Sequence, residues 1–141
     1  MGLFVARDVH NGYNYQKEVW LLIVGIGCDM VEIDRMQRSI SSRRFCEKCF
    51  SKKELEAFEG NASKLAGCFA AKEALGKALT SGIFSIELSE ISVLRGQRGE
   101  PYFEFCGDIK NKIEACMQTA LVSITNTKSM AVAFVVLEAK K

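Results

Sequence analysis

The chain is poor in histidine and has no long apolar run. Its single histidine, His10, argues against a Ser-His-Asp triad. The lone Cys46–Cys49 pair then has too few companion ligands to form a zinc site. No apolar run approaches the roughly 18 residues of a membrane helix, and the N-terminus lacks a signal-peptide pattern. We therefore expect a cytoplasmic protein without a membrane partner.

The composition is that of one ordinary globular domain. Hydrophobic residues make up 48% and charged residues 26% of 141 residues, enough to bury a sizeable core. Six cysteines could suggest disulfides, but nothing marks the chain as secreted, so we expect reduced thiols that pack in the core. The net charge is only +2, yet residues 35–53 carry seven basic side chains against one acidic side chain. Such a basic stretch attracts nucleic acid, a membrane surface or an acidic protein.

A long helix is expected around residues 69–79, which are rich in alanine, leucine, lysine and glutamate. Asn61 or Ser63 is placed to cap its start, and Gly82 to end it. Helical spacing puts Lys72 near the centre of the apolar stripe. Its ammonium therefore either reaches out to solvent or has a buried partner.

Glu73 and Lys77 project from the other side of this helix. They are four residues apart and lie among alanines, which would leave a shallow trough for a second body. One interpretation is a solvated salt bridge on a helix surface. The other is a carboxylate that binds a metal beside an ammonium that binds a phosphate. The helix alone leaves both open.

The rest of the pattern predicts short strands and helices. Residues 20–24 indicate a buried strand, and Gly25 and Gly27 a tight turn that a ligand can approach. Ser51 and Glu54 form a capping box that begins a short helix. The other expected elements are strands at 91–94 and 102–105, a helix at 108–117 and a hairpin at 121–125 and 130–137. We expect an α+β fold over 19–141, with a long central helix on a small antiparallel sheet, after a flexible extension over 1–18.

Four segments together resemble the motifs of bacterial holo-acyl-carrier-protein synthases, in the family's order. These segments are 25–35 (GIGCDMVEIDR), 69–79 (FAAKEALGKAL), 98–102 (RGEPY) and 122–128 (VSITNTK). The resemblance covers residues 22–138 and implies a single 4′-phosphopantetheinyl transferase domain. Such an enzyme moves the phosphopantetheine arm of coenzyme A to a serine of apo-acyl carrier protein, in support of fatty acid biosynthesis, and releases 3′,5′-ADP.

The resemblance also implies roles for individual residues. Asp29 and Glu73 would hold Mg²⁺, and Lys77 would contact the transferring phosphate; these are the expected catalytic residues. The expected coenzyme A contacts are Gly76, Lys77, Pro101, Asn126 and Thr127, and the expected docking residues for the acidic carrier are Arg35, Arg44 and Lys48. Members of the family are homotrimers with active sites between subunits.

Three positions depart from the family pattern. Cys68, Glu100 and Asn126 stand where members often carry arginine, lysine and histidine, at positions that serve mainly the nucleotide end of coenzyme A. We therefore expect weak recognition of the 3′-phosphate. Two alternatives stay open: a coenzyme A-binding protein without transferase activity, and a nucleic-acid-binding module with Phe45 and Phe50 as stacking groups.

Overall fold

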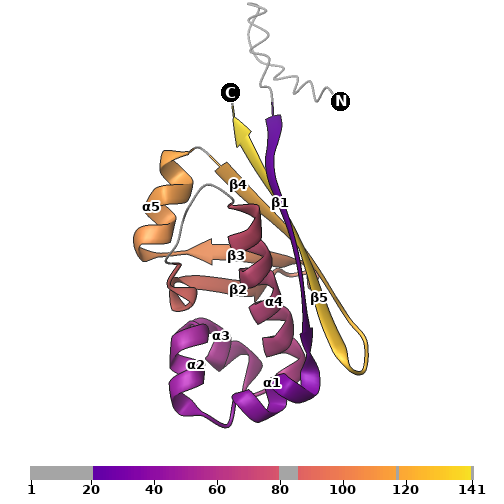
Figure 1. Ribbon diagram of the computed structural model, residues 1–141. Coiled ribbons are helices and arrows are strands. Elements are labelled where there is room, and N and C mark those ends of the chain that lie inside the picture. The colour runs from indigo at the N-terminus through magenta and orange to yellow at the C-terminus, as the bar shows by residue number, and fades with distance from the viewer. Residues whose placement is uncertain (1–20, 80–85, 117, 141) are drawn as a thin grey trace, which may run out of the picture.

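A computed structural model describes residues 21–79, 86–116 and 118–140 of the chain. In chain order the elements are β1 (Leu21–Glu32), α1 (Ile33–Ser39), α2 (Arg43–Cys49), α3 (Lys52–Phe58), α4 (Ala62–Ala78), the 3₁₀ turn η1 (Leu88–Glu90), β2 (Ile91–Arg95), β3 (Pro101–Phe105), α5 (Gly107–Ala115), β4 (Gln118–Asn126) and β5 (Met130–Lys140). The predicted α+β class is confirmed (Figure 1). The expected extension over 1–18, Trp20 and Gly82 lie outside the described residues. No helix among the described residues is long and apolar enough to cross a membrane.

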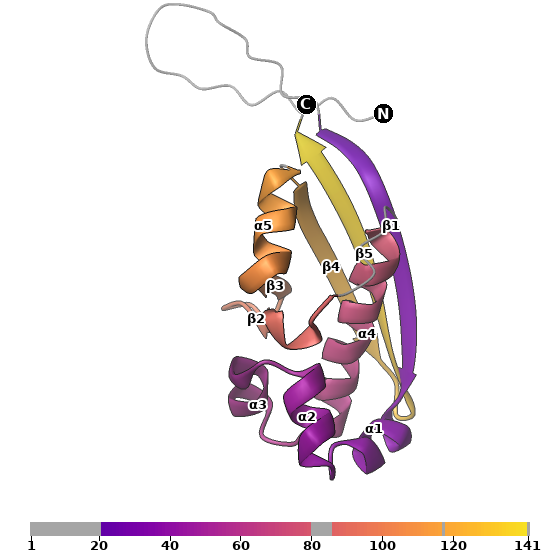
Figure 2. The ribbon, with the colours of Figure 1, turned by 60° about the vertical axis from the view of Figure 1, so that its left-hand side comes forward.

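The strands form two separate antiparallel sheets. The larger sheet has the order β1-β5-β4, and β2 pairs with β3 as a hairpin. In the larger sheet Cys28 lies opposite Phe134, which lies opposite Ser123 on its other side. In Figure 2 the described helices lie on one side of this sheet. The long central helix therefore packs on a small antiparallel sheet, as expected.

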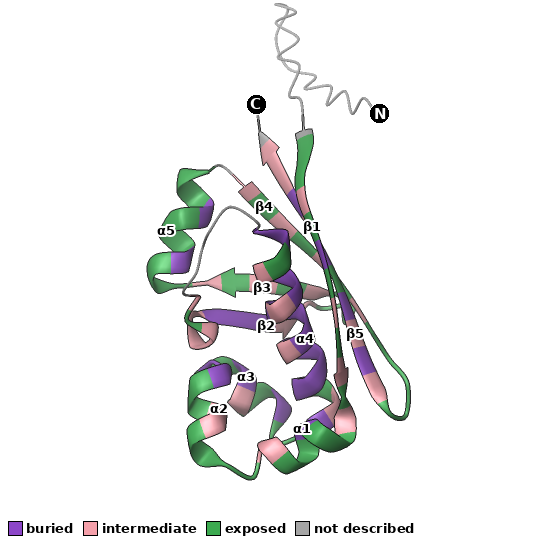
Figure 3. Ribbon diagram, in the orientation of Figure 1, coloured by how far each residue is buried: buried purple, intermediate pink, exposed green. Residues whose placement is uncertain are grey.

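Helix α4 is buried on nearly all sides. It begins where the side chain of Asn61 accepts a hydrogen bond from the backbone N–H of Lys64, so Asn61 is the cap. Ala66, Ala70 and Ala74 are all fully buried. The expected trough along these alanines is wrong, because β1 and β5 pack against the helix there. Figure 3 shows α4 as the most continuously buried helix of the domain.

Gly25 and Gly27 allow this close packing and do not form the expected turn. Strand β1 runs through both of them to Glu32. A Cβ atom on Gly27 would overlap the carbonyl oxygen of Ala74, and one on Gly25 would overlap the carbonyl oxygen of Ala78. The strand backbone thus lies directly against the helix backbone, which only glycine permits.

The opposite face of the larger sheet is exposed in the single chain. The strand expected to be buried at residues 20–24 is exposed where the structure describes its side chains: Leu22 is 47%, Ile23 67% and Val24 44% exposed. Further along β1, Ile26 is 60% and Met30 61% exposed. Phe134 at 45% and Leu121 at 49% continue this surface across β5 and β4. We call it the open sheet face; its members are Ile26, Cys28, Met30, Leu121, Ser123 and Phe134. A patch this apolar on a small domain is typical of an interface.

The short-range sequence signals are confirmed. Ser51 and Glu54 make both bonds of the capping box at the start of α3. The hairpins of β2 with β3 and of β4 with β5 lie where the sequence predicts them, as does α5. The six cysteines are all free thiols, as expected, although Cys28, Cys106 and Cys116 are exposed and not packed in the core.

Candidate active site

Asp29 is held on the face of β1 that packs against α4. It follows Gly25 and Gly27 at every second position, so it shares their side of the sheet. Its side chain is only 19% exposed. Because the glycines bring the strand against the helix, the carboxylate of Asp29 lies within reach of side chains from α4.

Lys77 meets Asp29 at this point. Its Nζ lies 2.8 Å from Oδ1 of Asp29 and 2.9 Å from the carbonyl oxygen of Cys28. Side chains on a helix lean toward its N-terminus, so Lys77 reaches back along α4 toward the level of Glu73. The hydrogen bond with Asp29 raises the pKa of Lys77 above its ordinary value, and the nearby negative charge of Glu73 acts in the same direction. Lys77 thus contacts Asp29 directly, and Glu73 lies one helical turn before Lys77 on α4.

The ion pair that Lys77 makes is with Asp29 on β1, and not with Glu73 as in the first of the two interpretations left open. Lys77 is about half exposed, at 55%, so this pair contributes little to stability. Glu73 is half-buried beside it. The surface-salt-bridge interpretation of Glu73 and Lys77 is therefore wrong, and the arrangement joins residues 48 positions apart.

Asp29 and Glu73 fit the chemistry of a hard divalent cation. Mg²⁺ in proteins prefers oxygen ligands and is commonly held by one or two carboxylates, with substrate phosphates and waters completing its shell. The described residues contain no cluster of three or more potential metal-ligating side chains. Two carboxylates alone match a cation that arrives with a phosphate substrate better than a closed structural site.

The other expected coenzyme A contacts lie at separate places. Gly76 is on α4 beside Lys77, and Pro101 begins β3 at the tip of the β2–β3 hairpin. Asn126 ends β4. Its side-chain amide donates to two oxygens of Ser63, to Oγ at 2.7 Å and to the backbone carbonyl oxygen at 3.0 Å. Ser63 and Lys77 are about 20 Å apart along the helix, at 1.5 Å per residue. Asn126 and Thr127 therefore lie near the start of α4, and the carboxylate cluster near its end.

The expected docking residues are all exposed. Arg35 lies on α1, and Arg44 and Lys48 lie on α2. Figure 1 shows α1 and α2 together at one end of the domain, next to α4. The basic stretch of the sequence thus becomes one solvent-facing end of the molecule.

Comparison with known proteins identifies the family. The sequence profile of the 4′-phosphopantetheinyl transferase superfamily matches residues 25–135. The chain belongs to this superfamily. It is 38% identical over 125 residues to the holo-[acyl-carrier-protein] synthase of Treponema denticola, covering 83% of this chain and 99% of that protein.

Solved structures of this superfamily have the same fold. The holo-(acyl-carrier-protein) synthase of Bacillus anthracis in complex with CoA (3′,5′-ADP) has a TM-score of 0.69 at 32% identity, over 83% of this chain and 97% of that chain. The holo-[acyl-carrier-protein] synthase of Helicobacter pylori in complex with coenzyme A has a TM-score of 0.70 at 29% identity, over 79% and 98% of the two chains.

Two departures from the transferase pattern have structural explanations. Cys68 is only 1% exposed and lies in the core, where its Sγ is 3.6 Å from the carbonyl oxygen of Val93, so it cannot contact a bound nucleotide. The carboxylate of Glu100 accepts the backbone N–H of Arg98 at 2.9 Å and covers Gly96, which closes the β2–β3 turn. The expectation that both positions face the nucleotide end of coenzyme A is therefore wrong for Cys68, and Glu100 is already used in its own turn.

Burial of Cys68 predicts a loss of stability at alkaline pH. Burial raises the pKa of its thiol to about 12, from an ordinary value of 9.0. Between these values the unfolded chain loses the proton and the folded chain keeps it, so rising pH favours unfolding. Relative to a Cys68→Ala variant, the wild type should lose up to about 1.4 kcal/mol per pH unit above pH 9.0. Urea unfolding of both proteins in reductant checks this, and Cys116→Ala, an exposed thiol, should leave the slope unchanged.

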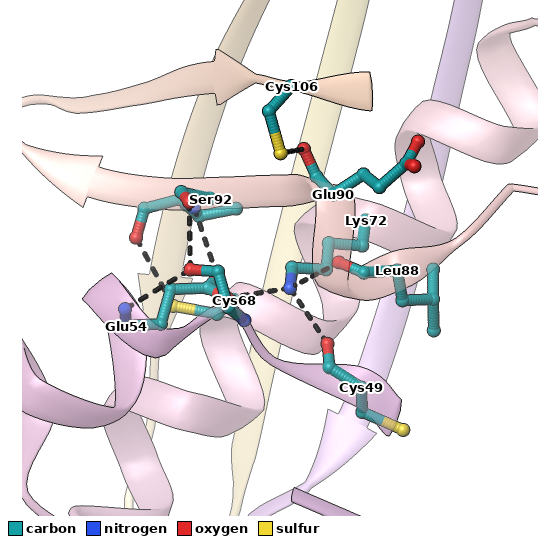
Figure 4. Close-up of polar contacts among 10 residues, drawn as sticks. Cys49, Glu54, Cys68, Lys72, Leu88, Glu90, Ser92 and Cys106 are labelled. Atoms are coloured by element: carbon teal, nitrogen blue, oxygen red, sulfur yellow. Dashed lines mark hydrogen bonds and ion pairs between the residues drawn. The ribbon is translucent and has the colours of Figure 1, made fainter. Parts of the chain in front are cut away.

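Sequence reasoning missed the partner of Lys72. The side chain of Lys72 is fully buried, and its Nζ lies 2.7 Å from Oε2 of Glu54, whose side chain is also fully buried (Figure 4). Of the two possibilities left open for Lys72, a buried partner is confirmed. The available signal was Glu54 itself, the acidic residue of the capping box that precedes Leu55 and Phe58.

Proposed function

We propose that this chain transfers the 4′-phosphopantetheine group of coenzyme A to a serine of an apo-acyl carrier protein and releases 3′,5′-ADP. The observation that carries the proposal is the contact of Asp29 on β1 with Lys77 on α4, one helical turn from Glu73, in a member of the transferase superfamily. The same activity in the named relatives supports it, as do the coenzyme A complexes. Incubation with apo-carrier, coenzyme A and Mg²⁺, followed by the intact mass of the carrier, tests it directly. A carrier of this kind would place the reaction in support of fatty acid biosynthesis.

The roles in the reaction follow from charge and position. Asp29 and Glu73 would hold Mg²⁺, whose charge lowers the barrier by offsetting the negative charge of the pyrophosphate. Lys77, which is exposed and close to both, would bind the transferring phosphate and stabilise the charge that develops on the departing 3′,5′-ADP. Its position at the end of a rigid helix orients that contact.

The alternatives gain no support from the geometry. A coenzyme A-binding protein without activity would have no need for Asp29, Glu73 and Lys77 to meet. In the nucleic-acid interpretation, Phe45 and Phe50 would stack on bases. Phe50 is only 2% exposed, and both rings pack against Phe69 at centroid distances of 6.1 and 6.5 Å, so they belong to the core.

We further propose that the docking residues receive the acidic carrier protein. Arg44→Glu should raise the KM for the carrier at least about tenfold, because a like charge at an interface both repels the partner and removes an attraction. The KM for coenzyme A should change less than about twofold, because α2 bears none of the residues expected to bind it. Steady-state kinetics with each substrate varied in turn measure both constants.

The control for this prediction is Lys112→Glu, an exposed reversal on α5. It makes the same change in net charge away from α1 and α2, and should leave both constants unchanged. Equal increases in the two KM values for Arg44→Glu would point to general damage and contradict docking at α2.

We also propose that three copies assemble through the open sheet face, with active sites between them. The support is the exposed apolar surface on β1, β5 and β4, together with the separation of the Asn126 region from the carboxylate cluster. A site spread over both regions is more easily completed by a neighbouring copy than within one chain. Light scattering should give three times the chain mass of 15.7 kDa.

The variant Phe134→Asp should shift this mass to that of a monomer. Phe134 lies on β5, the central strand of the open sheet face. In an assembly that forms through this face, a carboxylate at position 134 would be buried without a partner. Tyr102→Asp, a comparable exposed aromatic on β3, is the control and should keep the trimer mass. A wild-type monomer with full activity would contradict this assembly.

A further inference from the structure

The side chain of Lys72 is a junction between four parts of the fold. Its ammonium donates to the carbonyl oxygen of Cys49 at 2.7 Å, to the carbonyl oxygen of Leu88 at 2.8 Å and to Oε2 of Glu54 at 2.7 Å. An ammonium has three N–H donors, so all of them are used. Figure 4 shows these three acceptors arranged around one nitrogen atom, on α2, η1 and α3.

Glu54 extends the junction to β2. Its Oε2 also accepts the backbone N–H of Ser51 at 2.8 Å, and its Oε1 accepts the backbone N–H of Val93 at 3.0 Å. The hydroxyl of Ser92 in turn donates to Oγ of Ser51 at 2.7 Å. Among the described residues, no buried side-chain nitrogen or oxygen lacks a hydrogen-bond partner. The ion pair is therefore fully satisfied, and each bond fixes a direction.

The junction connects the helix proposed to dock the carrier protein with the helix that bears the proposed metal ligand Glu73. Cys49 is the last residue of α2, directly after the docking residue Lys48. Lys72 directly precedes Glu73 on α4. The residue before Glu73 on the helix is therefore bonded directly to the end of α2, at 2.7 Å from the carbonyl oxygen of Cys49. One side chain thus holds the end of the docking helix beside the carboxylate at the reaction centre.

The polarity of a helix C-terminus explains why a positively charged side chain is found at the end of α2. The last carbonyl groups of a helix have no partner within it, and the helix dipole places partial negative charge on them. Lys72 donates to one of these groups and lies 5.3 Å from the ring centroid of Phe50, the next residue along the chain. Stability alone does not demand an ion pair in a core, because apolar residues of the same size often serve equally well. An apolar pair could not make the directional hydrogen bonds that Lys72 donates to the backbone carbonyl groups of Cys49 and Leu88.

We propose that Lys72 and Glu54 are positioning residues for the carrier protein substrate: they set α2, with Arg44 and Lys48, at a fixed place relative to Glu73. The inference rests on the proposed transferase function. Loss of the pair should let α2 shift away from α4. The serine of the docked carrier would then be displaced from the phosphate that it attacks. The residues expected to contact coenzyme A lie outside α2 and would stay in place.

The decisive variant is the double substitution Lys72→Met with Glu54→Gln. It removes both charges, keeps the shape of the Glu54 side chain, shortens that of Lys72 by one atom and leaves an oxygen to cap α3. The kcat/KM for the carrier should fall at least about tenfold, as small misplacements remote from the chemistry commonly do. Coenzyme A affinity, measured by calorimetry on the same protein, should stay within about threefold of wild type.

Two further measurements separate positioning from mere destabilisation. The first uses Ile113→Ala as a stability control. Ile113 lies on the buried face of α5, away from the junction, so its replacement lowers thermal stability without changing the contacts of α2. It should leave the kcat/KM for the carrier unchanged. Combining the double variant with Arg44→Ala should give less than the product of the two separate effects on the KM for the carrier, because both act through α2.

Hydrogen exchange reads the position of α2 without turnover. In the double variant the α2 amides should exchange faster than in wild type, and those of α5 should not. If the double variant does not fold, Glu54→Gln alone should show the same pattern more weakly. Wild-type carrier kinetics in the folded variant, or an equal loss of coenzyme A affinity, would overturn the proposal. Absence of transfer by the wild-type protein would instead refute the proposed function and carrier positioning with it; the exchange rates would still decide whether Lys72 anchors α2.

Discussion

Glu73→Gln is expected to abolish most phosphopantetheine transfer while the fold survives. Glutamine keeps the shape of the side chain but removes one of the two negative charges beside Lys77. A metal ion at a phosphoryl centre contributes several kcal/mol to transition-state stabilisation, so the loss should be at least about a hundredfold in kcat. The intact mass of the carrier over time gives the rate, and circular dichroism with thermal melting reports the fold. Asp29→Asn should behave in the same way.

Glu114→Gln is the matched control for this experiment. Glu114 is an exposed carboxylate on α5 that lies 3.8 Å from Lys110, so the same chemical change occurs away from β1 and α4. Its transfer rate should equal that of the wild type. Unchanged transfer by both Glu73→Gln and Asp29→Asn, or by the wild type in excess chelator, would remove the metal role from the proposed function.

Gly27→Ala is expected to destabilise the folded domain by at least about 3 kcal/mol. The added methyl group would overlap the carbonyl oxygen of Ala74 and lie 2.9 Å from the backbone nitrogen of Ala78. Backbone atoms cannot turn aside as a side chain can, so β1 must move away from α4. Asp29, two residues further along β1, would then lose its contact with Lys77. Urea unfolding measures the stability, and transfer activity should fall with it.

Gly60→Ala separates this overlap from the general cost of replacing glycine. Gly60 has φ of 74°, and a Cβ there would meet nothing within 4 Å. Only the left-handed backbone conformation is penalised, by about 1–2 kcal/mol. If Gly27→Ala costs no more than Gly60→Ala, the contact between strand and helix is looser than the structure indicates.

Structural features that depend on residues close together in the chain could be predicted from the sequence. The capping box of Ser51 and Glu54 and the cap at Asn61 depend on residues three positions apart, and both are present. The two hairpins were readable for the same reason. Asp29 and Lys77, in contrast, were assigned through the family motifs, because no local pattern joins residues 48 positions apart.

The features that could not be predicted are set by tertiary packing. The alanines of α4 look like an exposed trough in the sequence, since small side chains fit both an open surface and a close backbone contact. The glycines of β1, which decide between the two, are remote in sequence. Glu54 lies 18 positions from Lys72, and its role in a capping box already accounted for it. Cys68 stands where relatives often carry arginine, but here it packs in the core against β2.

The enclosure of α4 has a consequence for the energetics of substrate binding. Rotation or sliding of this helix would drive the carbonyl oxygens of Ala74 and Ala78 into the backbone of β1. Glu73 and Lys77 project from this enclosed helix, so close packing fixes their backbone positions when the domain folds. The backbone of the proposed reaction centre is thus preorganised: little backbone conformational entropy remains to be lost there when substrates bind, and less of their binding free energy is diverted to ordering the protein.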